Sequence, residues 1–397
     1  MKMKCLSTFL SESKNTHLEH IEDSIFMSSD EVKDSIRFLT SLRNMLGGHS
    51  SKGIGLTVKW DGAPAIICGK DPENGKFFVG TKSVFNKTPK INYTNADINK
   101  NHSGGLADKL KIALKHLSKL EITGVLQGDL MFTEGDFVSK EIDGEQFITF
   151  TPNTITYAVS ENSLLSSKLK RAKMGIVFHT EYKGRTIQTM RASFGPKLRL
   201  KKSNDVWYDD SSFKDFSGVN LSSSDINKFD ASLTNATSLI KRVGRFLDSI
   251  EPNVQSLLKI YINSKVRVGT LEVSHNDFVK YVNGVYEGKI DKLGSDAGKS
   301  RKKKELDSIV STLNSQSSKY DDMFDLFGEL LVLKNIIVSQ LNKIKGKMKT
   351  FVKTDSGYKI TAPEGFVSID QKSDKAFKLV DRLEFSKNNF TVAKNWD

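Results

Sequence analysis

One lysine of the sequence stands inside a run of apolar and β-branched residues. In TVKWDGAPAI (57–66), Lys59 occupies a place where a strand usually carries Val or Ile, and Asp61 and Gly62 follow it. A lysine amine attacks an electrophile only when it is unprotonated, and burial or nearby cations lower its pKa toward that state. The stretch is therefore either an edge strand with a solvated lysine and an Asp-Gly turn, or a nucleophilic lysine beside a ligand that the bare backbone of Gly62 approaches closely.

Hydrophobic periodicity predicts the elements that position this lysine. A helix is expected over 28–46, because Ser28 and Glu31 have capping-box spacing and apolar residues recur every three or four positions. Short β-rich runs separated by Gly, Pro, Asp and Asn then predict strands. The predicted strands are 54–60, 64–69, 76–82, 124–132, 145–150 and 173–182, with a second helix over 106–120. The composition of DPENGK predicts a hairpin turn between the second and third of these strands.

The second half of the chain differs in composition and in hydrophobic periodicity. Ser and Asp are dense over 203–232, which predicts a linker or an irregular surface segment. Helical periodicity dominates 233–347, where the charged tract 294–308 is expected to be a loop running into a helix. Strand patterns return at 358–369 and 375–385. The predicted domains are an N-terminal helical segment (1–49), a first core part (50–203), a mainly helical insertion (204–349) and a second core part (350–397).

Composition limits the class of protein. Hydrophobic residues make up 38% of the 397 residues and charged residues 27%, as in soluble globular proteins. Lys and Arg exceed Asp and Glu by 13, which favours a polyanionic partner such as nucleic acid or simply gives a basic surface. No apolar run approaches the roughly 18 residues of a membrane span. The two cysteines have no metal-site spacing, and neither they nor the N-terminus indicates secretion, so a cytoplasmic protein is expected.

Six short motifs follow one another along the predicted strands. The first is Lys59-Trp60-Asp61-Gly62, and the others are GTKS (80–83), GDL (128–130), IVFHTEY (176–182), PEGFV (363–367) and FKLV (377–380). In this order they resemble the motifs of the covalent nucleotidyltransferase superfamily, which comprises the ATP-dependent DNA and RNA ligases and the mRNA capping enzymes. The overall pattern is most similar to bacteriophage polynucleotide-ligase-like proteins.

The resemblance implies a fold and a mechanism. The fold would be an α+β ligase-type nucleotidyltransferase with antiparallel sheets, interrupted by the helical insertion and without a C-terminal OB-fold. Lys59 would attack the α-phosphate of ATP to form lysyl-AMP, with Asp61 and Lys378 completing the catalytic set. Phe178 would stack on adenine, and Mg²⁺ or Mn²⁺ would be bound by Asp129 and Glu364. The nucleotide-binding residues would be Trp60, Gly62, Lys82, Phe178, Glu364 and Lys375.

The sequence departs from the family pattern at three points. Pro64 stands where an arginine is usual, and Asp129 replaces a glutamate. Lys375 lies three residues before Lys378, whereas the two lysines of the usual K-x-K motif are two residues apart. The predicted activity is ATP-dependent joining of 5′-phosphate and 3′-hydroxyl ends of DNA or RNA by a monomer. The alternatives are a capping-type guanylyltransferase and a non-catalytic nucleic-acid-binding protein that keeps the fold.

Basic residues of the insertion are the predicted contacts with nucleic-acid phosphates, with a solvated helix face as the alternative. These residues are Lys241, Arg242, Arg245, Arg301, Lys302, Lys303 and Lys304. His17 and His20 are spaced as i, i+3, but no third metal ligand is apparent. They are interpreted as surface or packing histidines.

Overall fold

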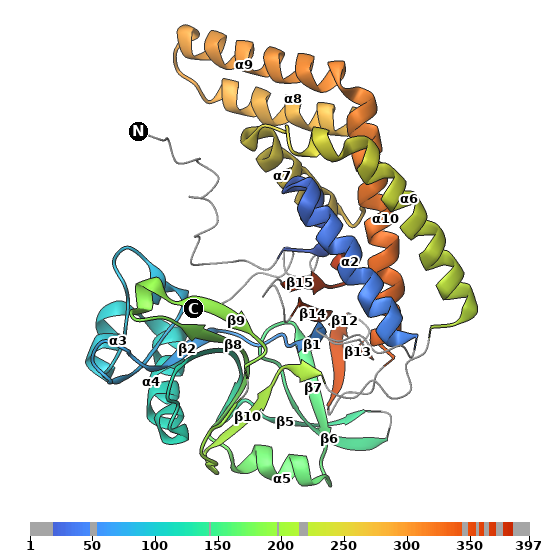
Figure 1. Cartoon of the computed structure of the whole chain (residues 1–397). Helices are drawn as coiled ribbons and strands as arrows, with labels where there is room; N and C mark the ends of the chain where they lie inside the picture. Colours follow the sequence, from blue (N-terminus) through green and yellow to red (C-terminus); the bar gives the residue numbers. More distant parts are fainter. Residues whose placement is uncertain are drawn as a thin grey trace.

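The computed structural model of the protein describes residues 19–47, 54–142, 144–196, 198–213, 221–343, 348–354, 357–360, 365–370 and 376–383. Three β-sheets lie together in one part of the molecule, and a group of long helices extends away from them (Figure 1). The combination of helices with mainly antiparallel sheets confirms the predicted α+β class.

The sheet that carries Lys59 is built from distant parts of the sequence. Its strand order is β11-β1-β14-β15, and neighbouring strands are antiparallel. The first part of the predicted core supplies β1 (Ile54–Lys59), and the second part supplies β14 (Gly365–Asp370) and β15 (Ala376–Leu379). The outer strand β11 (Ser212–Phe213) is a two-residue segment. The helical segment in between is therefore an interruption of one sheet.

A second sheet continues the core beside the first. Its order is β10-β8-β4-β2-β3. Strand β9 pairs with residues 180–183 of β8, beyond the residues 174–178 that pair with β10. The predicted hairpin at DPENGK joins β2 to β3. Helix α4 (Gly104–Leu117) shares a hydrophobic cluster with one face of this sheet. The strands are β2 (Ala65–Lys70), β3 (Phe77–Gly80), β4 (Val125–Thr133), β8 (Met174–Lys183), β9 (Arg191–Phe194) and β10 (Val206–Asp210). The short helices of this region are η2 (Lys82–Phe85), α3 (Asn95–Asn101), η3 (Ser118–Leu120) and η4 (Ile187–Thr189).

The third sheet again joins the two parts of the core. Its order is β13-β12-β7-β6-β5, so that β12 from the second part pairs with β7 from the first. Helix α5 (Leu164–Arg171) follows β7. The strands are β5 (Val138–Ile142), β6 (Glu145–Phe150), β7 (Ile155–Ser160), β12 (Lys349–Thr354) and β13 (Gly357–Ile360).

The long helices form a group that we call the helical unit. It combines η1 (Ile21–Phe26) and α2 (Ser29–Leu46) with α6 (Ser223–Leu247), α7 (Pro252–Val268), α8 (His275–Asp291), α9 (Asp296–Ser315) and α10 (Ser317–Leu341). The Ser28 side chain caps α2 by accepting the Glu31 N–H over 3.2 Å, as its spacing predicts. One hydrophobic core runs through η1, α2 and the later helices, and α8 and α9 form the part farthest from the sheets (Figure 1).

Two predictions for the insertion are wrong. The described residues of 203–232 do not form a linker, because they include β10 and β11 and the start of α6 at Ser223. The charged tract 294–308 runs into a helix as predicted, but its charged part is not a loop, because Ser295 caps a helix that runs from Asp296 through all its basic residues. Pairing with distant strands stabilises β10 and β11, and local Ser and Asp content does not report such pairing.

Candidate functional site

Lys59 is the last residue of β1 and lies on the sheet face that points away from the helical unit. Successive side chains of a strand point to opposite faces. Leu56 and Val58 pack with the hydrophobic core of the helical unit. Thr57 and Lys59 therefore point to the other face, toward the remaining two sheets.

Lys378 shares this face with Lys59. Val367 pairs with Thr57 on one side and with Lys378 on the other, so these three residues form one row across the sheet. Lys59 lies two residues beyond Thr57 on the same strand. The strands of the two lysines have only β14 between them and are thus about 10 Å apart. The structure therefore brings together the two lysines to which the sequence assigns catalytic roles.

The Lys59 strand is joined directly to the second sheet. The Val58 N–H donates a hydrogen bond to the Ser211 carbonyl over 2.8 Å, and the Ser211 N–H donates to the Phe178 carbonyl over 3.0 Å. Val380, which follows β15, belongs to the same hydrophobic cluster as Val177 of β8. The lysine-bearing face of the first sheet therefore meets the Val177 face of the second sheet.

That face of the second sheet carries acidic groups. Val177 pairs with Asp129 on one side and with Asp209 on the other, which places both carboxylates in one row. His179 lies beside them, with Nε2 3.6 Å from Asp129 Oδ1 and Nδ1 2.7 Å from the Thr180 hydroxyl. Sequence reasoning missed Asp209 because it assigned this segment to a linker. The β-rich VWY before Asp209 was the available signal.

Asp61 is bound by the loop between β6 and β7. Its side chain is buried, and Oδ2 accepts hydrogen bonds from the Thr154 N–H (2.7 Å), the Thr154 hydroxyl (2.7 Å) and the Ile155 N–H (2.8 Å). Oδ1 accepts from the Asn153 amide over 2.8 Å, and the Asp61 N–H donates to the Tyr157 hydroxyl. The carboxylate that the sequence assigns to catalysis therefore holds the β1–β2 connection onto the third sheet.

Gly62 allows a close approach between the β1–β2 connection and β4. A Cβ atom at this position would lie 2.6 Å from Asp129 Cβ and 2.9 Å from the Leu130 carbonyl oxygen. The neighbouring Ala63 N–H donates to that carbonyl over 2.9 Å. The glycine predicted to approach a nucleotide thus brings the Lys59 segment against the strand of Asp129.

Trp60 contributes to the aromatic part of the core. Its ring stacks on Tyr157 with centroids 5.3 Å apart and meets the Trp207 ring edge-on at 6.4 Å. The side chain is only partly buried. Its predicted contact with a nucleotide therefore depends on the exposed part of the ring.

Phe178 lies on the opposite side of its strand from the acidic row. The ring is fully buried in the hydrophobic cluster that contains Ile66, Leu110 of α4 and Leu130. An adenine base reaches this ring only if the core opens. The alternation of β8 instead places His179 on the face of Asp129.

The structure describes one of the three other predicted nucleotide ligands. Lys82 begins η2 and is partly buried. Glu364 and Lys375 lie outside the described residues. The roles assigned to these three residues therefore stay predictions.

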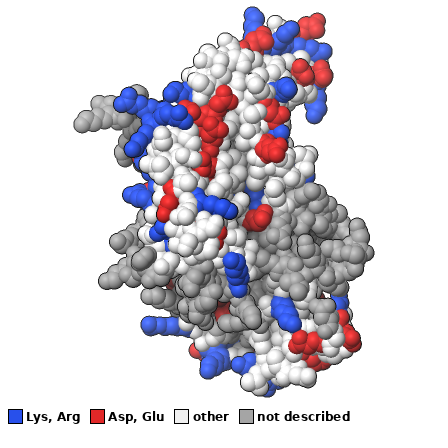
Figure 2. All heavy atoms as spheres, turned by 90° about the vertical axis from the view of Figure 1, so that its right-hand side faces the viewer, with Lys and Arg blue, Asp and Glu red and all other residues white. Residues whose placement is uncertain are grey.

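The predicted nucleic-acid contacts lie on two helices of the helical unit. Arg242 forms an ion pair with Asp322 at 2.8 Å, and Lys302 forms one with Glu305 at 2.7 Å. Figure 2 shows Lys and Arg side chains interspersed with Asp and Glu on one face of the molecule. The exposed members of the predicted set are Lys241, Arg242 and Arg245 on α6, and Arg301, Lys303 and Lys304 on α9.

Metal ligands are few in the part of the chain that the structure describes. Within it, no group of three or more His, Cys, Asp or Glu side chains is arranged to hold a metal ion. Asp129 and His179 form a pair, and Glu364, the other predicted ligand, is outside that part. An oxygen-preferring cation such as Mg²⁺ usually needs only one or two carboxylates when phosphates supply further ligands, so the exposed part of Asp129 fits this role.

The fold and the site define an α+β protein in which a two-lysine sheet face meets a face with two aspartates and a histidine. Residues 15–394 match the model of a family of unknown function, DUF6267, and the chain belongs to that family. No curated protein and no solved structure matches the chain. None of the described helices is long and apolar enough to cross a membrane.

Proposed function

We propose that the protein is a lysine-dependent nucleotidyltransferase of the polynucleotide-ligase type. The observation that carries the proposal is the convergence of Lys59 and Lys378 on one sheet face, from motifs at opposite ends of the sequence. The meeting of this face with the Asp129 row adds support. Together the two faces supply the cations and the carboxylates that a phosphate-transfer site needs.

In the proposed reaction, the unprotonated amine of Lys59 attacks the α-phosphate of ATP. The Nζ–P bond forms as the bond to the pyrophosphate oxygen breaks, pyrophosphate leaves, and the attacking nitrogen releases one proton to solvent. Lys378 neutralises charge on the α-phosphate from the same face. Asp129 would help to hold Mg²⁺, which would supply positive charge that neutralises the phosphates. Asp61 and Gly62 set the position of the Lys59 segment against β4 and the third sheet.

The adenylate then passes to a 5′-phosphate end of DNA or RNA, and a 3′-hydroxyl displaces AMP to join the strands. The net charge of +13 supports a polyanionic substrate. The exposed basic residues of α6 and α9 are the proposed phosphate contacts. Acidic partners such as Asp322, which pairs with Arg242, would limit phosphate contact to parts of these two helices.

The test is covalent labelling. The full chain is incubated with α-labelled ATP or GTP and Mg²⁺, and the products are separated on a denaturing gel. Lys59→Ala is compared with Lys70→Ala, because Lys70 also ends a strand but is exposed at the end of β2. We expect an ATP-derived label that Lys59→Ala abolishes and Lys70→Ala retains.

Two other outcomes lead to different conclusions. Labelling by GTP alone would assign the protein to the capping type. A folded protein that binds nucleic acid but takes no label from either nucleotide would rule out the proposed chemistry and leave a binding protein.

A further inference from the structure

His20 lies at the edge of the sheet that carries both lysines. The Lys378 N–H donates to the Glu19 carbonyl over 3.0 Å, and His20 forms an isolated parallel bridge with Lys378. The segment before η1 thus continues the sheet order beyond β15. His20 precedes the first residue of η1, but its side chain makes no capping hydrogen bond there.

The His20 imidazole is surrounded by positive charge. Burial lowers its pKa well below the ordinary value of 6.5, and Arg382, Lys334, Lys378 and Lys59 lower it further, in that order. Both lysines of the proposed site are therefore close enough to His20 to influence its charge. Lys334 of α10 and Arg382, which follows β15, approach it as well.

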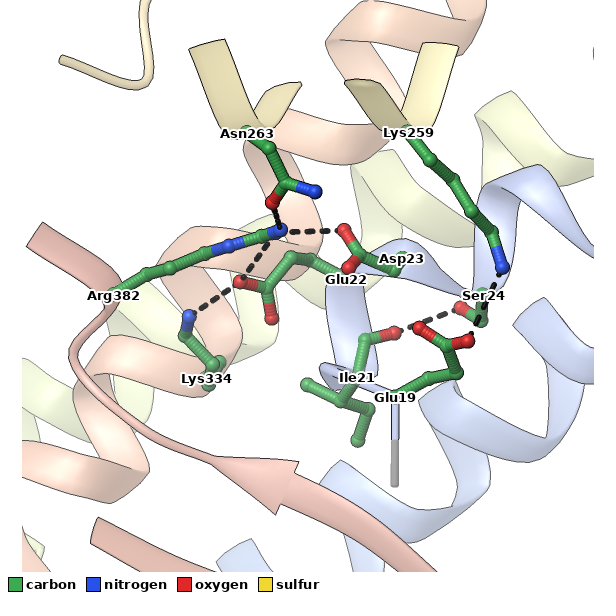
Figure 3. Close-up of polar contacts among 9 residues, drawn as sticks. All are labelled: Glu19, Ile21, Glu22, Asp23, Ser24, Lys259, Asn263, Lys334 and Arg382. Atoms are coloured by element: carbon green, nitrogen blue, oxygen red, sulfur yellow. Dashed lines mark hydrogen bonds and ion pairs between the residues drawn. The ribbon is translucent and has the colours of Figure 1, made fainter. Parts of the chain in front are cut away.

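Those two cations already bind carboxylates of η1 (Figure 3). Lys334 Nζ lies 2.8 Å from Glu22 Oε1, and Arg382 Nη1 lies 2.7 Å from Asp23 Oδ1. All four side chains are buried. This cluster fixes η1, and with it His20, against α10 and the segment after β15.

The Nδ1 atom of His20 is buried and has no hydrogen-bond partner among the described residues. Buried polar atoms are nearly always paired, so the unpaired Nδ1 leaves a hydrogen-bonding position that a ligand can fill. A neutral imidazole carries one N–H, which donates readily to an anionic oxygen. A cation at this position would be repelled by the four neighbouring positive groups.

We propose that His20 is a phosphate ligand of the Lys59–Lys378 face, where its Nδ1–H donates a hydrogen bond to a phosphate oxygen of the bound nucleotide. The choice of nucleotide as ligand rests on the proposed function. The alternative source of the same chemistry is the 5′-phosphate of a nucleic-acid end. In either case His20 contacts the ligand itself and does not act through another residue.

The experiment uses inorganic pyrophosphate as the probe, so that binding is measured without covalent chemistry. Calorimetry gives its affinity for the wild-type chain, His20→Ala, His20→Asn and His102→Asn. His102 is a matched control, because it also lies near a lysine but belongs to the α3 region. We expect about a tenfold loss of affinity in His20→Ala, as for one charge-assisted hydrogen bond. Asn keeps a donor N–H and should recover part of it, and His102→Asn should bind normally.

A second measurement follows the wild-type chain and uses a variant only to assign one signal. The ε1 resonances of the seven histidines are followed by NMR, and the His20 signal is identified by its absence in His20→Asn. Pyrophosphate should shift this signal and raise the His20 pKa, because the anion offsets the nearby cations. Parallel titrations with an oligonucleotide, with and without a 5′-phosphate, distinguish the two phosphate sources: a response confined to the 5′-phosphorylated strand would overturn the nucleotide assignment.

The outcomes separate this inference from the proposed function. If lysyl-AMP forms but His20→Ala binds pyrophosphate as tightly as the wild-type chain, the role of His20 is wrong and the nucleotidyl transfer stands. If pyrophosphate binds and shifts His20 but no adduct forms, the phosphate ligand stands and the nucleotidyl transfer is wrong.

Discussion

Thr154 holds the Asp61 carboxylate with two hydrogen bonds of 2.7 Å, one from its backbone N–H and one from its hydroxyl. The aspartate that follows the proposed nucleophile by two residues is thereby turned toward the protein. Lys59 owes its position to this contact, because the β1–β2 connection is fastened to the third sheet there.

The first prediction concerns this contact. Asp61→Ala leaves several buried donors without an acceptor, so we expect a loss of about 3 kcal/mol or more in the free energy of unfolding. Thr154→Val removes only one hydroxyl and should cost about 1 kcal/mol. Urea denaturation followed by circular dichroism measures both. Equal stability of Asp61→Ala and the wild-type chain would contradict a structural role.

The second prediction tests the position of Phe178. Because the ring is fully buried, Phe178→Ala should cost about 3–5 kcal/mol of stability, and Phe178→Leu much less. Phe178→Leu should also keep the wild-type yield of nucleotide adduct. The yield is read from the labelling gel at several ATP concentrations, and a selective rise in the ATP requirement of Phe178→Leu would favour stacking on adenine instead.

The third prediction concerns the buried Lys334–Glu22 pair. Lys334→Met leaves the Glu22 charge without its closest partner, so stability should fall by about 3–5 kcal/mol. The double variant Lys334→Met, Glu22→Leu removes both charges and should be more stable than Lys334→Met alone. Arg382 keeps Asp23 as its partner in the double variant. Urea midpoints of the single and double variants measure the two stabilities. A double variant less stable than Lys334→Met would contradict the prediction.

The fourth prediction is a pH dependence. Because the folded-state pKa of His20 lies below the ordinary 6.5, the unfolded chain binds a proton there first as the pH falls. His20 therefore contributes stability above pH 6.5 that is lost as the pH drops below that value. The unfolding free energy of His20→Asn should fall less between pH 7 and 5. Burial raises the pKa of Asp23 to about 6, but Asp23 is present in both proteins and largely cancels in the difference. Parallel curves for the two proteins would exclude the effect.

Local signals in the sequence predicted the local elements. The Ser28 cap, the β2–β3 hairpin and α4 depend on residues within a few positions of each other, and the structure has each of them. The α+β class was implied by the resemblance to the nucleotidyltransferases. The elements β10 and β11 were missed because their partners are remote strands.

The candidate site was predictable in its lysines and less so in its surroundings. Ordered motifs identified Lys59 and Lys378, and the register of β14 places them on one face. The partners of Asp61 lie more than 90 positions away in the chain, so no spacing rule indicated its burial. His20 was interpreted as a surface or packing residue because its sequence shows a histidine pair without a third metal ligand. The lysines near His20 are brought there by the fold, and the local sequence does not indicate them.

The pairing of β1 with β14 sets the order in which the protein can mature during synthesis. Thr57 and Val367, which face each other across these strands, are 310 positions apart. Helices α6 to α10 of the helical unit lie between them, and η1 and α2 precede both, so the unit can pack while the ribosome is still translating. Such long-range pairing forms late and slowly. A nascent chain therefore carries Lys59 on an incomplete sheet, and its proposed chemistry is withheld until β14 and β15 have emerged from the ribosome.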